Sequence, residues 1–138
     1  MKKLIVFLVV LVLTVKLNAQ NIDWKNATNW QLYNTREIAA FDFTLATLKE
    51  FRSIPLNLDT MQAFLEKTEQ WPKEKYSMWS GLYVVTCELP NAGTRNIEIS
   101  VYGGFFYDDK TKRYYQLPLE IRNDWLEYLS NKSSTFSL

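Results

Sequence analysis

The chain has 138 residues, of which 47% are hydrophobic and 15% aromatic, and its formal net charge at pH 7 is +1. This composition excludes an intrinsically disordered chain, because nearly half of the side chains can be buried in a core. The sequence contains no histidine and a single cysteine, Cys87. It therefore lacks the commonest general base and cannot form an internal disulfide bond.

Residues 1–19 have the pattern of a secretory signal peptide. Lys2 and Lys3 precede an apolar run over 4–15, and Ala19 stands before Gln20, as in exported bacterial proteins. The apolar run is shorter than the roughly 18–20 residues of a membrane-spanning helix. We therefore expect cleavage before Gln20 and a secreted or periplasmic mature protein with no stable membrane insertion.

Cleavage would change the charge of the protein. Loss of Lys2, Lys3 and Lys16 lowers the number of Lys and Arg residues from 16 to 13, against 15 Asp and Glu residues. A slightly acidic chain lacks the basic field that dominates binding to nucleic acids. We therefore expect no nucleic-acid partner.

The N-terminal half shows helical spacing of apolar residues. The polar segment 20–34 is expected to be an extended lead-in or a short edge strand. A core-facing stripe predicts a first helix over 36–52, with a later start near Phe43 as an alternative, ended by Pro55. A second helix is predicted over 59–71, where Asp59 and Gln62 fit a capping box.

The C-terminal half shows the two-residue period of strands. A hairpin is predicted here: a strand over 81–89 is followed by a Pro-Asn-Ala-Gly turn and an alternating strand over 96–102. Its apolar face should hold Tyr83, Val85, Cys87, Leu89, Ile97, Ile99 and Val101, with Cys87 as a small buried residue. Its wetter face should hold Thr86, Glu88, Glu98 and Ser100.

The remaining elements follow in order. Gly103–Gly104 is either a hairpin turn or a bulge, and we favour the bulge because 105–107 leads directly into a better turn at 108–112. A last strand is expected over 113–117. Pro118 then opens a C-terminal helix, whose buried face contains Ile121, Trp125, Leu126 and Leu129.

These elements predict an α+β fold. Two N-terminal helices precede an antiparallel three- to four-stranded β-meander, and a C-terminal helix packs on one sheet face. The signal peptide at 1–19 and the lead-in at 20–34 precede a single domain over 35–130. Residues 131–138 are expected to be a flexible tail.

The other face of the predicted sheet is the candidate binding surface. It would carry Glu98, Ser100, Tyr102 and Phe106, and exposed aromatic side chains on a sheet suit stacking on a sugar ring or docking of a protein. The alternative is that these aromatic residues only fill the sheet edge beneath covering loops. Asp108–Asp109 lacks the spacing of a calcium-binding loop. We therefore expect neither a metal site nor a cofactor.

Catalytic motifs are absent from the sequence. Without histidine, only two-carboxylate hydrolysis by Glu88, Glu98 or Asp108 stays open. The sequence therefore favours a secreted or periplasmic non-catalytic binding protein of unknown ligand, such as an envelope inhibitor or immunity-type protein with a protein or glycan partner. The alternative is a small secreted carboxylate-dependent hydrolase.

Overall fold

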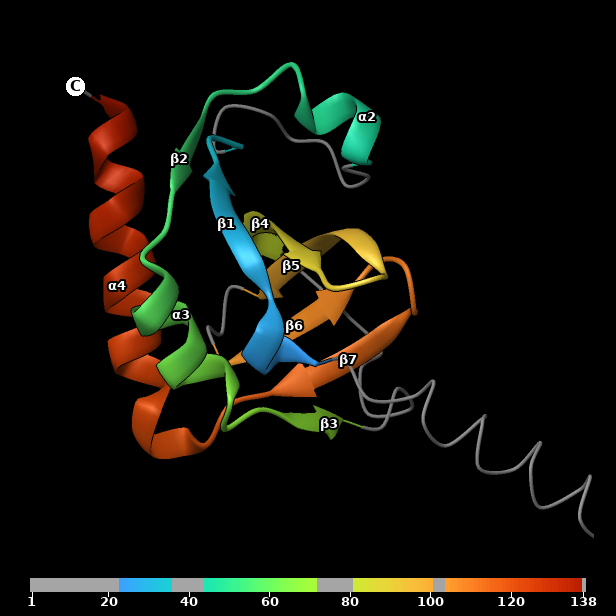
Figure 1. Cartoon of the computed structure of the whole chain (residues 1–138). Coiled ribbons are helices and arrows are strands. Elements are labelled where there is room, and N and C mark those ends of the chain that lie inside the picture. Colours follow the sequence, from blue (N-terminus) through green and yellow to red (C-terminus); the bar gives the residue numbers. More distant parts are fainter. Residues whose placement is uncertain (1–22, 36–43, 72–80, 101–103, 138) are drawn as a thin grey trace, which may run out of the picture.

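Seven antiparallel strands form one sheet in the order β2-β1-β4-β5-β6-β7-β3 (Figure 1). The structure is a computed structural model and describes residues 23–35, 44–71, 81–100 and 104–137. The strands are β1 (Thr28–Tyr33), β2 (Ser53–Pro55), β3 (Glu69–Trp71), β4 (Gly81–Leu89), β5 (Gly93–Ser100), β6 (Phe105–Asp108) and β7 (Arg113–Gln116).

The helices of the described residues are short except for the last. They are α2 (Leu45–Leu48), α3 (Leu58–Leu65) and α4 (Arg122–Ser134), with 3-10 turns η1 (Trp24–Asn26), η3 (Leu119–Ile121) and η4 (Thr135–Ser137). Figure 1 shows α3 and α4 lying together on one side of the sheet. No helix in the described part of the chain combines the length and apolar character needed to cross a bilayer.

The core lies between the sheet and these two helices. Trp24 packs near its centre, with its ring 5.6 Å from that of Phe106 and 5.5 Å from that of Tyr115, both edge-on. Phe64 of α3 packs edge-on against Trp125 of α4 at 5.1 Å. Edge-to-face contacts of this kind add stability beyond the burial of apolar area, and they join η1 to the sheet and α3 to α4.

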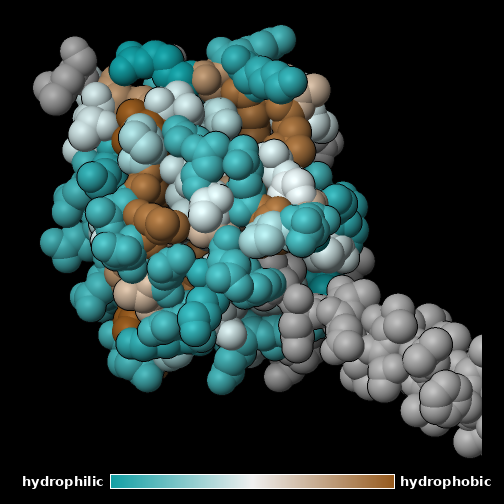
Figure 2. Space-filling model, in the orientation of Figure 1, coloured by the Kyte–Doolittle hydropathy of each residue, from teal (hydrophilic) through white to brown (hydrophobic). Residues whose placement is uncertain are grey.

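The face of the molecule seen in the orientation of Figure 1 is mostly hydrophilic. Figure 2 shows an apolar strip near α3 and an apolar patch at α2 within this hydrophilic surface. Among the described residues, Leu45 of α2 and Leu58 of α3 are each 40% exposed, and Leu119 is 75% exposed. Apolar residues exposed singly are common in soluble proteins and do not by themselves indicate a binding site.

The prediction of two N-terminal helices and a three- to four-stranded meander is wrong, because the sheet has seven strands. β1 lies between β2 and β4, so it is neither a lead-in nor an edge strand. The strands β2 and β3 have three residues each. A strand of that length shows no alternation in sequence, and only its pairing partner defines it.

The two helices are accordingly shorter than predicted. Within 36–52, residues 36–43 lie outside the described part, and α2 begins after Thr44, whose hydroxyl accepts a bond from the Thr47 amide. The second helix begins after Asn57, whose side chain caps the Thr60 amide. It ends at Leu65 rather than at Trp71, because 69–71 pairs with β7 as β3.

The predictions for the C-terminal half agree better with the structure. The β4–β5 register confirms that Val85 and Ile97 share the core face with Tyr83 and Ile99. In α4, Trp125 and Leu129 are 1% and 0% exposed, as predicted. The helix continues to Ser134 and is followed by η4, so the segment expected to be a tail is mostly helical.

Gly104 allows the first turn of α4 to approach the sheet. The Leu117 amide donates to the Gly104 carbonyl at 2.8 Å, and Arg122 Nε donates to the Leu117 carbonyl at 2.9 Å. The Arg122 guanidinium also stacks on Phe105 at 4.5 Å. A Cβ at residue 104 would lie 2.1 Å from Cδ of Arg122, so a larger residue cannot coexist with this contact.

Gly104→Ala should lower the free energy of unfolding by about 1–3 kcal/mol, the usual cost of overpacking. In an Arg122→Ala background the same change should cost much less, because the side chain that the new methyl meets is gone. Urea denaturation of the four proteins measures this coupling as a double-mutant cycle. Equal losses in both backgrounds would contradict the proposed role of Gly104.

Candidate functional site

The sheet face opposite α3 and α4, here called the outer face, carries a continuous row of side chains. Cross-strand pairing aligns Glu98 of β5 with Tyr107 of β6, Tyr107 with Tyr114 of β7, and Tyr114 with Trp71 of β3. These four residues form the aromatic row, and all of them are partly exposed. Because side chains alternate along a strand, neighbours such as Phe106 and Tyr115 point into the core instead.

Two rings of the aromatic row pack against each other, and a charged pair lies beside them. Tyr107 and Tyr114 lie 4.8 Å apart at an interplanar angle of 39°. Lys112 Nζ lies 6.0 Å from the Tyr107 ring and pairs with Asp109 at 2.7 Å. Burial raises the pKa of Tyr107, and the positive charge of nearby Lys112 partly opposes this increase. The phenol is therefore protonated at neutral pH and can donate a hydrogen bond.

The middle of the outer face is buried. Val84 and Thr86 of β4 are 3% and 4% exposed, and Asn96 and Ser100 of β5 are 3% and 1% exposed. Side chains at these positions are not available to a ligand. The outer face is therefore accessible at its two ends, with the aromatic row at one end.

The other end carries a chain of hydrogen-bonded polar side chains, here called the polar ladder: Ser53, Gln31, Asn29 and Glu88. Ser53 Oγ donates to Gln31 Oε1 at 3.4 Å, Gln31 Nε2 donates to Asn29 Oδ1 at 3.2 Å, and Asn29 Nδ2 donates to Glu88 Oε1 at 3.2 Å. The ladder crosses β2, β1 and β4. Tyr33 lies beside it, opposite Ser53, with its hydroxyl accepting a bond from Thr86 at 3.4 Å.

The structure separates the four residues that sequence reasoning placed on the binding surface. Glu98 lies in the aromatic row, whereas Ser100 is buried. Phe106 is 1% exposed and stacks on Tyr115 in the core at 5.3 Å. Tyr102 lies outside the described residues. Of the four, Glu98 is therefore the residue that the structure brings to the accessible outer face.

The three carboxylates considered for hydrolysis are not grouped together. Glu98 pairs with Val84 and Glu88 with Thr94, so the two lie four positions apart along the hairpin, about 13 Å between backbones at ~3.3 Å per residue. Paired carboxylates in glycosidases lie about 5–9.5 Å apart. Asp108 is fully buried in other contacts.

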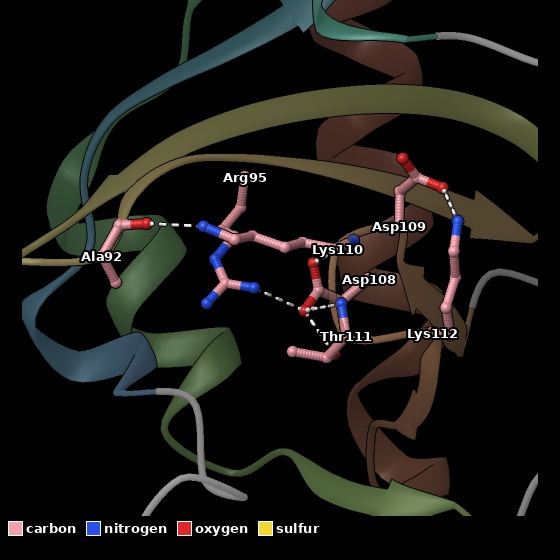
Figure 3. Close-up of polar contacts among 7 residues, drawn as sticks. All are labelled: Ala92, Arg95, Asp108, Asp109, Lys110, Thr111 and Lys112. Atoms are coloured by element: carbon pink, nitrogen blue, oxygen red, sulfur yellow. Dashed lines mark hydrogen bonds and ion pairs between the residues drawn. The ribbon is translucent and has the colours of Figure 1, made fainter.

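Asp108 lies in a buried corner where the β4–β5 and β6–β7 turns meet (Figure 3). Its Oδ2 accepts bonds from Arg95 Nη1 at 3.1 Å and from the Thr111 hydroxyl at 2.5 Å, and its side chain also accepts from the backbone amides of Lys110 and Thr111. Lys110 Nζ reaches the Ala92 carbonyl in the β4–β5 turn at 3.3 Å. Asp108 therefore has a structural role, because these bonds fix the β6–β7 turn against β5.

Cys87 lies in the core opposite Arg95 on the neighbouring strand and is 0% exposed. Burial raises the pKa of its thiol to about 12; Asp108 adds to the increase, and Arg95 partly opposes it. Thiolate is the reactive form of cysteine. At neutral pH the side chain is thus a neutral buried thiol, consistent with its expected role as a core residue.

Sequence reasoning missed most residues of the outer face. Tyr107, Tyr114 and Trp71 belong to three strands, and their alignment follows from pairing that local patterns do not contain. The alternation of Trp30 and Leu32 with Gln31 and Tyr33 indicated a possible short edge strand, but it did not show that β1 lies inside the sheet. The described residues contain no group of three or more Cys, Asp or Glu side chains able to hold a metal ion.

Comparison with known proteins assigns neither a family nor a function to the chain. The chain matches no protein-family model, no curated protein and no solved structure.

Asp108→Ala should lower the free energy of unfolding by about 3–5 kcal/mol, because it leaves the Arg95 guanidinium buried without its counterion. The adjacent Asp109→Ala removes only the exposed pair with Lys112 and should cost less than about 1 kcal/mol. Chemical denaturation of both variants checks the difference. Similar small losses in the two variants would show that the buried pair does not matter for folding.

Cys87 should make stability depend on alkaline pH. Its folded pKa of about 12 lies above the ordinary 9.0, so its contribution is present below pH 9 and is lost as the pH rises toward 12. The difference in unfolding free energy between wild type and Cys87→Ala should shrink by about 1.4 kcal/mol per pH unit in that range. Denaturation curves at several alkaline pH values test this, and a constant difference would contradict it.

Proposed function

We propose that the protein is a non-catalytic binding protein that acts in the periplasm or after secretion and binds its ligand on the outer face of the sheet. The observation that carries this proposal is the aromatic row. Its aligned, partly exposed aromatic side chains lie on three adjacent strands, and Glu98 on the neighbouring β5 ends the row.

The aromatic row has the properties of a recognition surface. Tyrosine and tryptophan offer large rigid contact areas and a polar group, and they lose little conformational entropy on binding. The row lies on paired strands, so the ladder hydrogen bonds hold its backbone, and Tyr107 and Tyr114 pack against each other. Sites on strands keep their geometry better than sites on loops.

The polar groups around the row would orient a ligand. Glu98 stands at one end. Gln116 lies two residues after Tyr114 on β7, and its pairing partner Glu69 lies two residues before Trp71 on β3. Asp109 and Lys112 form an exposed pair beside Tyr107. A few polar groups at the margin of an aromatic surface are the usual source of orientation and specificity in binding sites.

Export is the second part of the proposal. It rests on the short apolar run and the Ala19–Gln20 junction of the sequence. Intact-mass measurement of the natively produced protein should give a chain beginning at Gln20. A cytosolic chain retaining Met1 would overturn the extracytoplasmic assignment.

The aromatic row is tested by capture experiments. Immobilised mature protein is incubated with envelope extract, and retained molecules are identified by mass spectrometry and by glycan analysis. Tyr114→Ala should reduce capture of a specific ligand about tenfold or more, because it removes a central aromatic contact. Glu98→Gln, which keeps the shape of the side chain, should reduce it less.

Asn131→Ala on the exposed surface of α4 is the matched control and should capture as wild type does. Circular dichroism confirms that each variant is folded. The proposal fails if nothing is captured specifically, or if the captured ligand is retained equally by wild type and Tyr114→Ala.

A further inference from the structure

The polar ladder at the other end of the outer face is oriented by its last member. Glu88 can only accept hydrogen bonds when ionised, so Asn29 must present its amide nitrogen to it, and Gln31 must present its nitrogen to Asn29. Each donor in the polar ladder therefore points toward Glu88. Aligned bonds of this kind polarise one another and hold the amide groups in one orientation.

The ladder leaves hydrogen-bonding capacity unused. Each amide nitrogen has two hydrogens, and within the described residues Asn29 and Gln31 each use one of them on the ladder. The Glu88 carboxylate has further lone pairs beyond the one that Asn29 uses. Asn29, Ser53 and Glu88 are exposed and Gln31 is partly exposed, so a ligand can reach both the donors and the acceptor.

The backbone of β1 positions Asn29. The pairing of β1 with β4 shifts register between Thr28 and Gln31, and Asn29 has a φ of 51°. Asparagine is among the few residues other than glycine that adopt this left-handed conformation. Bulges redirect side chains, and this one directs the Asn29 amide toward Glu88.

An aromatic ring lies next to the ladder. Tyr33 follows Gln31 by two residues on β1, so both side chains lie on the outer face. Tyr33 pairs with Ser53 across β1 and β2, and the Thr86 hydroxyl fixes its phenol. The ring is partly exposed and is held in place at the end of the ladder.

We propose that Tyr33 and the polar ladder form a subsite for a neutral saccharide. This inference rests on the proposed binding function and names its ligand class. A sugar hydroxyl both donates and accepts, so it can accept from an Asn29 or Gln31 amide hydrogen while donating to Glu88. The apolar face of a pyranose ring can stack on Tyr33.

The charge of the ladder selects against anionic ligands. Its only charged member is Glu88, and the ladder contains no Lys or Arg that could pair with a phosphate, sulfate or carboxylate. An anionic ligand would meet the Glu88 carboxylate without compensation, which is the usual way in which a site rejects a wrong partner. Uncharged hydroxyl groups complement the ladder without this cost.

Native gel electrophoresis of the mature protein through gels containing one soluble polysaccharide tests the subsite. The neutral probes are laminarin, xyloglucan, galactomannan and dextran, and the anionic probe is polygalacturonate. We expect retardation in at least one neutral gel and none in polygalacturonate. Asn29→Gly, which tolerates the positive φ and deletes the amide, should weaken that binding about tenfold.

Two further comparisons separate the ladder from general effects. Tyr33→Phe should keep most of the affinity because the ring remains, whereas Tyr33→Ala should lose about tenfold or more; Asn131→Ala on α4 should bind as wild type does. The inference is overturned if no neutral polysaccharide retards the protein, if polygalacturonate retards it equally, or if Asn29→Gly and Tyr33→Ala bind normally. If capture through Tyr114 persists in that case, the proposed binding function stands and only the saccharide subsite fails.

Discussion

The pairing of β4 with β5 is the constraint on which the rest of the structure depends. Its register sets Val85 opposite Ile97 and Tyr83 opposite Ile99, so these side chains share the face that the helices cover. A shift of one residue would turn the apolar side chains outward and the polar ones into the core. The outer face depends on the same register, because β1 carries the polar ladder beside β4 and β6 carries Tyr107 beside β5.

The buried pair of Arg95 and Asp108 acts in this framework as a positioning device. A buried ion pair adds little net stability compared with apolar residues of similar size, but removing one partner is costly. Here Asp108 also accepts bonds from the β6–β7 turn, so the turn and β5 keep a fixed relation. With its one thiol buried, the described fold depends on packing and on such polar contacts instead of disulfide bonds.

The outer face combines two chemistries on one rigid support. At one end aromatic rings from three strands lie in a row; at the other, amide and carboxylate groups are held in a single orientation. The buried middle separates them. A ligand that uses both ends must be extended across the strands, whereas a compact one would use a single end, and the shared sheet keeps either arrangement preorganised.

The sequence alone determined the β4–β5 hairpin, the two strands that follow and the C-terminal helix, because each carries a periodic pattern over enough residues to be read locally. It also identified Glu98 as an outward-facing residue. Only the tertiary structure decided that β1 lies inside the sheet, that β2 and β3 form its edges, and that Trp71 aligns with Tyr114. The physical reason is that a strand obtains its hydrogen-bond partners from segments distant in the chain. In addition, segments of three residues such as 53–55 and 69–71 are too short to show a periodic pattern.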